Sequence, residues 1–193
     1  MDNNTFSTIS TVIKTRRTIK PGTMNGQKIP NGHIAAILEL ADWAPTHAFT
    51  EPWRFVIYED PTVFCKQHAE LYKTHTPAEN FKEATYTNLQ NIGNNASHVV
   101  IAVMKRGSNP NIPALEEVAA ASAAVQNILL AATSLNIGSF WSTGGMTLKP
   151  AMKNFLELAE EDAVLGLLYL GYTDNQPEGR RVTPLEEKVK WVK

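Results

Sequence analysis

Three short segments of almost continuous apolar residues constrain the fold of this chain most strongly. They cover residues 53–58 (WRFVIY), 98–104 (HVVIAVM) and 164–172 (VLGLLYLGY). Their length and their content of β-branched and aromatic residues predict strands. A strand that is apolar on both faces must be covered on both sides of its sheet. We therefore expect an α+β protein built as a three-layer α/β sandwich, with residues 53–58 in a central position.

The segments between these strands carry helical periodicity. The most regular one is 115–135, where alanines make the expected helix small and apolar nearly all round. Such a helix is usually buried, at a domain centre or against a second subunit. Residues 78–93 are more polar, and they could instead form a mobile flap over a site. Further helices are predicted at residues 5–16, from residue 34 to Pro45, at 61–73, and over about ten residues from Pro150.

Length and composition favour one soluble domain over residues 1–193. The net charge of −1 argues against broad electrostatic binding to nucleic acid or to an anionic membrane. The single cysteine, Cys65, excludes an intramolecular disulfide and a cysteine-based metal cluster, and a small buried role is expected for it. The first residues do not resemble a signal peptide, and no apolar run approaches the ~18 residues of a membrane span. These features predict a cytoplasmic protein.

The common motifs of side-chain catalysis and of nucleotide binding are missing from the sequence. It contains no P-loop, no G-x-G-x-x-G and no G-x-S-x-G. His68 and His75 stand seven residues apart around Glu70, a spacing that favours a solvated helix face over a metal site. The carboxylate groups at 116–117 and 160–162 are expected at helix starts, where the helix dipole stabilises them. We expect no catalytic side chain and no metal site.

Two basic pairs near opposite ends of the chain are candidates for binding an anion. Arg16 and Arg17 follow the first predicted helix, and Arg180 and Arg181 lie near the end of the chain. Cations also suit a helix C-terminus because they oppose its negative dipole end, so the first pair has a purely structural interpretation. Guanidinium groups alternatively match phosphate oxygens bidentately.

Two loops combine aromatic rings with hydroxyl groups or glycines. The loop at 41–55 contains Trp43 and His47, and the histidine beside a proline turn has no obvious packing role. The segment 138–145 contains Trp141, and aromatic loops often carry binding. Ser142, Thr143 and the backbone of Gly144 and Gly145 in that segment could bring donors close to a flat ring. Trp53 is expected in the core.

These segments together resemble the nitroreductase family of FMN-dependent oxidoreductases, over nearly the whole chain. The likeness depends on their order and spacing, since each motif alone occurs widely. Thr18 stands where serine is usual, and Glu51 stands where many members have glutamine, so the role of Glu51 is open. The matching segments are residues 16–18, 43–47, 51–55, 138–144 and 170–172, followed by Pro177 and residues 180–181.

The resemblance implies an intertwined homodimer around a central mixed sheet, with two FMN sites across the interface. By the same resemblance, Arg16, Arg17 and Thr18 bind the phosphate, ribityl or pyrimidine end of FMN, and Arg181, with Arg180, reaches the phosphate. Trp43 and His47 come from the partner subunit. The ring is lined by Trp141, Ser142 and Thr143.

The implied activity is hydride transfer from NAD(P)H through FMN to nitroaromatic, quinone or similar small acceptors, with ping-pong kinetics. Because the cofactor carries this chemistry, the lack of a catalytic constellation is consistent with it. Two alternatives remain at this point. One is a protein that stores or senses FMN with little turnover, and the other is a dimer that binds a small molecule other than a flavin.

Overall fold

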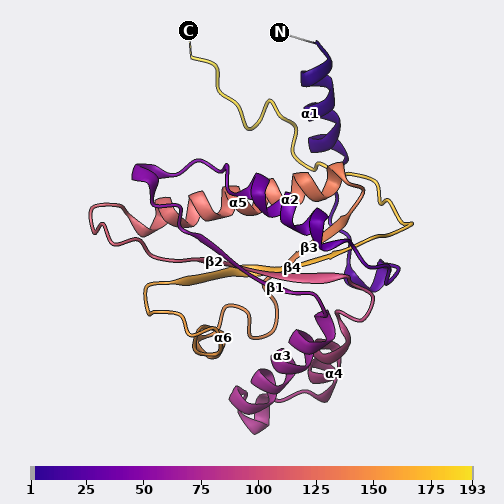
Figure 1. Ribbon diagram of the computed structural model, residues 1–193, viewed down its shortest axis with the longest axis vertical. Coiled ribbons are helices and arrows are strands. Elements are labelled where there is room, and N and C mark those ends of the chain that lie inside the picture. Colours follow the sequence, from indigo (N-terminus) through magenta and orange to yellow (C-terminus); the bar gives the residue numbers. More distant parts are fainter. Residues whose placement is uncertain (1–2, 193) are drawn as a thin grey trace.

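The computed structural model describes residues 3–192, and its centre is a four-stranded sheet (Figure 1). The strands lie in the order β1-β2-β4-β3, and each neighbouring pair is antiparallel. The parallel part of the expected mixed sheet is confined to one bridge, between Thr18 and Ser139. The bounds are β1 (Trp53–Tyr58), β2 (His98–Met104), β3 (Gly138–Ser142) and β4 (Ala163–Gly171).

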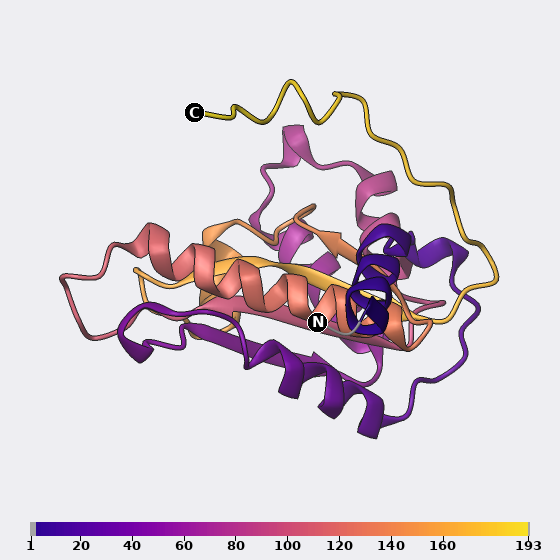
Figure 2. The ribbon, with the colours of Figure 1, turned by 90° about the horizontal axis from the view of Figure 1, so that it is seen from above.

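Helices cover both faces of this sheet, as the apolar strands require. On one face α2 (Asn31–Ala41) and α5 (Ala114–Ser134) lie side by side, as Figure 2 shows. The other face carries α3 (Pro61–His75) and α6 (Pro150–Phe155), and α4 (Glu83–Asn91) packs against α3. Helix α1 (Asn3–Thr15) and the C-terminal tail extend away from the sheet on the α5 side (Figure 1). The predicted three-layer α+β architecture is confirmed.

Strand β2 shows why the sheet needs two cores. All of its residues are buried. Alternate side chains of a strand point to opposite faces, so Val100, Ala102 and Met104 join the core under α2 and α5. The intervening Val99 and Ile101 join the core under α3 and α6. A continuous apolar run is therefore satisfied by two separate layers of helices.

The central position predicted for residues 53–58 is wrong, because β1 is an edge strand that pairs only with β2. Its Trp53 is 5% exposed, whereas Val56 and Ile57 are 40% and 38% exposed. Apolar composition predicts a strand but does not give the number of its neighbours. Because β4 occupies the other side of β2 and β3 lies beyond β4, β1 is left at the edge of the sheet.

Several predicted helix boundaries also change. Helix α6 has six residues instead of about ten, and Glu157 just after it has a positive φ of 54°. Segment 78–93 is divided into a 3-10 turn at Ala78–Asn80 and the helix α4. Two more 3-10 turns lie at Pro21–Thr23 and His47–Phe49. After α5 the left-handed residue is Asn136, with φ 57°, which lets the chain turn directly into β3.

Helix α5 is buried against the sheet as predicted. Its residues Ala121, Ala124 and Ala132 are at most 1% exposed, and their small side chains let the helix axis approach the strands closely. By length and composition alone this helix could also cross a membrane, and 44% of the window concerned is buried. Its contacts with all four strands identify it as the core helix of this fold. Cys65 is fully buried, as expected.

Candidate functional site

The first basic pair lies beside the beginning of β3. The chain leaves α1 at Thr15, and the Ile19 amide then donates to the Ser139 carbonyl at 2.9 Å. Ile19 is buried, which anchors this short extended segment against the sheet. Arg16 and Arg17 are consequently held half-buried next to β3, and Thr18 is exposed there.

Arg17 has a structural role at the end of α1 and also contacts the C-terminal tail. Its guanidinium donates to the Lys14 carbonyl at 2.6 Å, which caps the last turn of α1 as the helix-end interpretation predicts. The same group donates through Nε to the Pro177 carbonyl at 3.1 Å. The two ion pairs found among the described residues involve neither Arg16 nor Arg17. The positive charge of this pair is therefore not neutralised by a carboxylate within the described chain.

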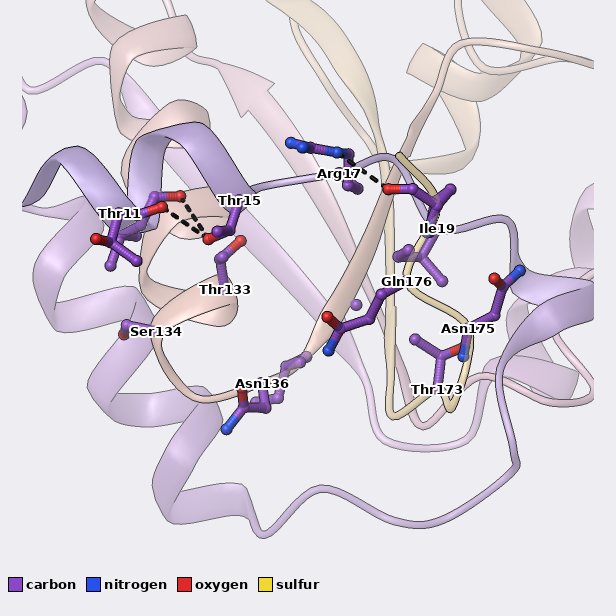
Figure 3. A pocket seen from close by; sticks show the side chains of 14 residues that line it. Thr11, Thr15, Arg17, Ile19, Thr133, Ser134, Asn136, Thr173, Asn175 and Gln176 are labelled. Carbon is purple, nitrogen blue, oxygen red and sulfur yellow. Dashed lines mark hydrogen bonds between the residues drawn. The ribbon is translucent and has the colours of Figure 1, made fainter. Parts of the chain in front are cut away.

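A cavity of about 570 Å³ lies next to Arg17. It is open to solvent and is lined by the end of α1, the end of α5, the beginning of β3 and the first residues of the tail (Figure 3). Its wall is rich in hydroxyl and amide side chains, which include Thr11, Thr15, Thr133, Ser134, Asn136, Thr173, Asn175 and Gln176. An adjoining cavity of about 190 Å³ is lined by Thr18 and also by Lys20. Lys20, a third cation four residues after Arg16, was missed at the sequence level.

Trp141, Ser142 and Thr143 lie at the other end of β3. Strand geometry separates Gly138 at the cavity from Ser142 by about 13 Å. The Trp141 Nε1–H donates to the Leu165 carbonyl at 2.9 Å, and the indole lies against Gly166. Ser142 accepts a hydrogen bond of 3.3 Å from the Gly144 amide at its Oγ. The structure thus joins both predicted groups, the basic pair and the Trp141–Thr143 segment, through one short strand.

The second basic pair lies on the tail just beyond its contact with Arg17. Gly179 packs directly against the Arg17 guanidinium, which would have to shift to admit a Cβ atom there. Arg180 and Arg181 follow and are exposed, and Arg181 donates to the Arg180 carbonyl at 3.0 Å. Basic residues from opposite ends of the chain therefore approach each other in space.

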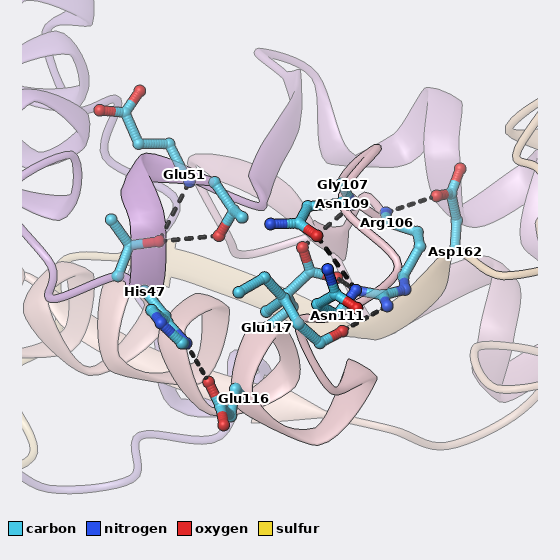
Figure 4. Close-up of polar contacts among 12 residues, drawn as sticks. His47, Glu51, Arg106, Gly107, Asn109, Asn111, Glu116, Glu117 and Asp162 are labelled. Atoms are coloured by element: carbon cyan, nitrogen blue, oxygen red, sulfur yellow. Dashed lines mark hydrogen bonds and ion pairs between the residues drawn. The ribbon is translucent and has the colours of Figure 1, made fainter.

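Trp43 and His47 are not part of this arrangement within one protomer. The His47 Nδ1 lies 2.6 Å from Glu116 Oε2 at the beginning of α5 (Figure 4). Glu116 and the cavity residue Thr133 are separated by about 25 Å of helix at 1.5 Å per residue. Trp43 is 82% exposed. A site that contains both groups would have to include a second copy of the chain.

The loop that holds His47 is strained. Ala48, Phe49 and Glu51 have positive φ angles of 50°, 56° and 40°, a conformation that costs about 1–3 kcal/mol for each non-glycine residue. The Thr46 hydroxyl accepts a 3.1 Å hydrogen bond from the Glu51 amide across the loop. Phe49 at the tip is 89% exposed. The loop presents its aromatic ring and His47 to the outside of the protomer.

Trp53 is buried as expected. Its Nε1 donates to Asp42 at 2.8 Å and closes the base of the aromatic loop. The indole is therefore part of the core that supports the loop, and it is not a wall of the candidate site.

Of the two acidic groups expected at helix starts, Glu116 and Glu117 do lie in the first turn of α5, whereas residues 160–162 do not begin a helix. Glu117 is 1% exposed, and its carboxylate is paired with the Arg106 guanidinium (Figure 4). Asp162 lies before β4 instead of at a helix start, and its carboxylate accepts from the Arg106 amide at 2.8 Å. A helix dipole alone does not explain a buried carboxylate. These contacts fix the loop between β2 and α5.

The expected solvated position of His68 is also wrong. Its side chain is 1% exposed, and its Nε2 accepts a 2.8 Å hydrogen bond from the Met146 amide, in the turn that follows Thr143. Burial lowers the pKa of His68 to about 4. His75 on the same helix is exposed. No group of three or more potential metal ligands was found among the described residues.

Comparison with known proteins agrees with this fold. The model of the nitroreductase family matches residues 13–172. A Bacillus subtilis (strain 168) protein provisionally named NAD(P)H nitroreductase YfhC is 27% identical and covers 94% of this chain, at 93% of its own length. A solved nitroreductase-like protein of Bacillus cereus is 26% identical with a TM-score of 0.83, and 95% of each chain is covered. A Desulfovibrio desulfuricans structure, described as a complex of a provisional nitroreductase with FMN, is 22% identical with a TM-score of 0.71 over 96% of each chain. The chain therefore belongs to the nitroreductase family.

Proposed function

We propose that residues 1–193 form one FMN-binding domain that passes hydride from NAD(P)H to nitroaromatic, quinone or similar small acceptors. The observation that carries this proposal is the contact of Arg17 with Pro177 and Gly179, directly before the tail arginines, at the end of β3 that lies a strand length from Trp141. The FMN named in one family structure and the NAD(P)H named for one relative support the choice of cofactor and reductant. The cytoplasmic location, without a nucleic-acid or membrane partner, stays a prediction.

The residues present suit FMN. Arginines match a phosphate group, whose two negative charges need cations that no carboxylate has already neutralised. The cavity beside Arg17 falls within the usual size of small-molecule sites, and its hydroxyl and amide lining suits a polar sugar-like chain. The Trp141 ring and the Ser142 and Thr143 hydroxyls offer a flat surface with polar atoms for a heterocycle.

In the proposed mechanism this chain binds and orients, and bound FMN supplies the hydride chemistry. Arg16, Arg17 and Thr18 hold the phosphate and ribityl end, assisted by Arg180 and Arg181. Trp141, Ser142 and Thr143 position the ring. Lys20 lines the cavity that adjoins the one beside Arg17 and would add positive charge near the bound cofactor. One pocket used in turn by reductant and acceptor predicts ping-pong kinetics.

We further propose a homodimer whose partner completes each site. On α1, Phe6, Ile9 and Ile13 are 78%, 54% and 50% exposed, so an apolar stripe of this helix lacks cover within one protomer. On the tail, Val182 and Trp191 are 81% and 87% exposed. A second copy that covers these surfaces could also bring Trp43 and His47 of the partner subunit to the site.

The dimer has a direct test. Sedimentation of the full chain should give about twice the protomer mass of 21.3 kDa. Replacing Ile9 and Ile13 together by serine should shift the protein toward the monomer, because it removes apolar area from the unpartnered face of α1. A wild-type protein that sediments as a monomer at every concentration would refute the dimer.

The cofactor proposal can be tested by colour. Purified protein should be yellow, or should become yellow after FMN is added and the excess is removed. Arg17→Ala and Arg181→Ala should retain less FMN, whereas Lys14→Ala, which removes a cation from the exposed face of α1, should retain as much as wild type. If the wild-type protein is colourless under both conditions, every flavin-based function is contradicted. The remaining hypothesis would then be a dimer that binds a small molecule other than a flavin.

Turnover separates the enzyme from an FMN-storage or sensing protein. Under anaerobic conditions NADH or NADPH should bleach the yellow enzyme, and a nitroaromatic or a quinone should restore the colour. Yellow protein that neither nucleotide bleaches would support storage or sensing.

A further inference from the structure

The turn that follows the Trp141–Thr143 segment packs against a buried histidine, His68. His68 lies on α3, on the opposite side of the turn from solvent, and is 1% exposed. Its Nε2 accepts the Met146 amide proton at 2.8 Å. The Thr147 hydroxyl donates to the Gly144 carbonyl at 2.6 Å, and the Gly144 amide donates to Ser142 Oγ at 3.3 Å. A short series of contacts therefore connects His68 with the end of β3.

This hydrogen bond fixes the tautomer of His68. Because Nε2 accepts a proton from Met146, the ring proton of neutral His68 must be on Nδ1. Nδ1 is the buried side-chain nitrogen without a hydrogen-bond partner among the described residues. A buried unpaired donor costs free energy, and such groups are rare in folded proteins. Keeping this histidine thus has a cost that an apolar residue would avoid, which indicates that the acceptor at Nε2 is needed.

Gly145 shows how closely the turn is fitted to α3 and α4. Its φ is +63°, and a Cβ atom placed on it would lie 2.8 Å from both His68 Nε2 and Leu89 Cδ2. Only glycine combines this backbone conformation with such a close approach. The turn consequently packs against both helices. The rings of Phe64 and His68 have centroids 5.4 Å apart, and this contact limits rotation of the imidazole.

We propose that His68 is a positioning residue, which holds the Gly144–Met146 turn so that Ser142 and Thr143 are presented to the flavin ring. This inference rests on the proposed FMN function. In this proposal His68 contacts neither the cofactor nor a substrate. It acts through the Met146 amide, and in this proposal α3 and α4 together support the loop that faces the flavin.

The lowered pKa of His68 is consistent with this role. With a pKa of about 4, caused by burial, the ring is neutral at ordinary working pH. A neutral ring keeps the Nε2 lone pair available for the Met146 amide. A protonated ring would direct a second N–H at that amide and lose the hydrogen bond.

The test compares two substitutions of His68 in the full-length apoprotein. His68→Gln places an amide oxygen near the position of Nε2 and can still accept from Met146, whereas His68→Leu leaves that amide without an acceptor. FMN affinity is measured by fluorescence quenching, and the absorption band of bound FMN is recorded as a second readout. Loss of the acceptor should weaken FMN binding about tenfold and shift the band, while His68→Gln should stay within about twofold of wild type.

Two further variants complete the design. Gly145→Ala inserts a methyl group between the turn and His68, so it should weaken binding like His68→Leu, and it decides the test if His68→Leu fails to fold. His75→Leu makes the same chemical change at an exposed position of α3 and should bind as wild type does.

Two failures can be told apart. If wild-type protein binds FMN and both His68→Leu and Gly145→Ala bind it equally well, the positioning role is overturned and the proposed function stands. If His68→Gln is as weak as His68→Leu, the acceptor role is overturned. If wild-type protein itself binds no FMN, the proposed function fails, and the inference fails with it.

Discussion

The Arg17 guanidinium donates a 3.1 Å hydrogen bond to the Pro177 carbonyl, across 160 positions of the chain. The same side chain caps the last turn of α1 through the Lys14 carbonyl. Arg17 therefore ties the beginning of the chain to the tail that carries Arg180 and Arg181. The helix-cap and anion-site interpretations of this residue are compatible, because one planar group has several donors.

Replacing Arg17 by alanine should loosen the tail. The tail after residue 173 is mostly exposed, and its attachment at Pro177 would lose a charge-assisted hydrogen bond. We expect trypsin to cleave after Arg180 or Arg181 several-fold faster in Arg17→Ala, as followed by mass spectrometry of the released peptide. Lys14→Ala is the control, since only its main-chain carbonyl contacts Arg17. Equal cleavage rates in Arg17→Ala and wild type would show that the contact does not hold the tail.

Replacing Arg106 by methionine should destabilise the fold strongly. Glu117 is 1% exposed, and without Arg106 its carboxylate would remain buried with the Gly107 amide at 3.0 Å as its remaining donor. Removing one partner of a buried ion pair typically costs about 3–5 kcal/mol. Urea unfolding measures the loss. The neighbouring Glu116, paired with His47 on the surface, is the matched control, and Glu116→Ala should cost at most about 1 kcal/mol. Equal losses would contradict a special role for the buried pair.

His68 should make stability depend on pH. Its folded pKa of about 4 lies below the value of 6.5 for an unperturbed histidine, so the unfolded chain binds its proton first as the pH falls. The free energy of unfolding should therefore be highest above pH 6.5. Between pH 6.5 and pH 4 it should fall by about 3 kcal/mol through the titration of His68.

Urea unfolding at pH 7 and pH 4.5 would measure this loss. His68→Gln cannot titrate, so it should lose about 2–3 kcal/mol less than wild type between these two values. Burial also lowers the pKa of His98, which remains in both proteins, so the difference between them isolates His68. Identical pH dependence in the two proteins would mean that His68 is protonated equally in the folded and unfolded chains.

Gly166→Ala should displace Trp141. Gly166 has a φ of +154°, and a Cβ atom there would overlap the indole ring, which is held by the Leu165 carbonyl. Overpacking of this kind costs about 1–3 kcal/mol. In a Trp141→Ala background the indole no longer blocks the added methyl group, so the same substitution should cost less, and what remains is the backbone strain at φ +154° and the contact with the Ser142 carbonyl. Additive costs in this double-mutant cycle would show that the two residues do not compete for one space.

Most residues of the proposed site were chosen from the sequence because they carry local signals. Arg16 and Arg17 follow a helix, and Trp141, Ser142 and Thr143 stand between glycines, while Thr18 and the proposed roles came from the resemblance to the nitroreductase family. Lys20 and His68 were missed or misplaced, since a lone lysine or histidine has no local signal. Their positions depend on the bridge from Thr18 to Ser139 and on the turn at Met146.

By itself the sequence determined the three apolar strands, the helices between them and the need for two covering layers. These follow from periodicity and from the burial of apolar side chains, which act over a few neighbouring residues. Only the tertiary structure decided that β1 is an edge strand, that Glu117 and His68 are buried, and that Arg17 meets Pro177. Each of these depends on contacts between segments far apart in the chain. Such long-range contacts leave no pattern in the local sequence around either residue.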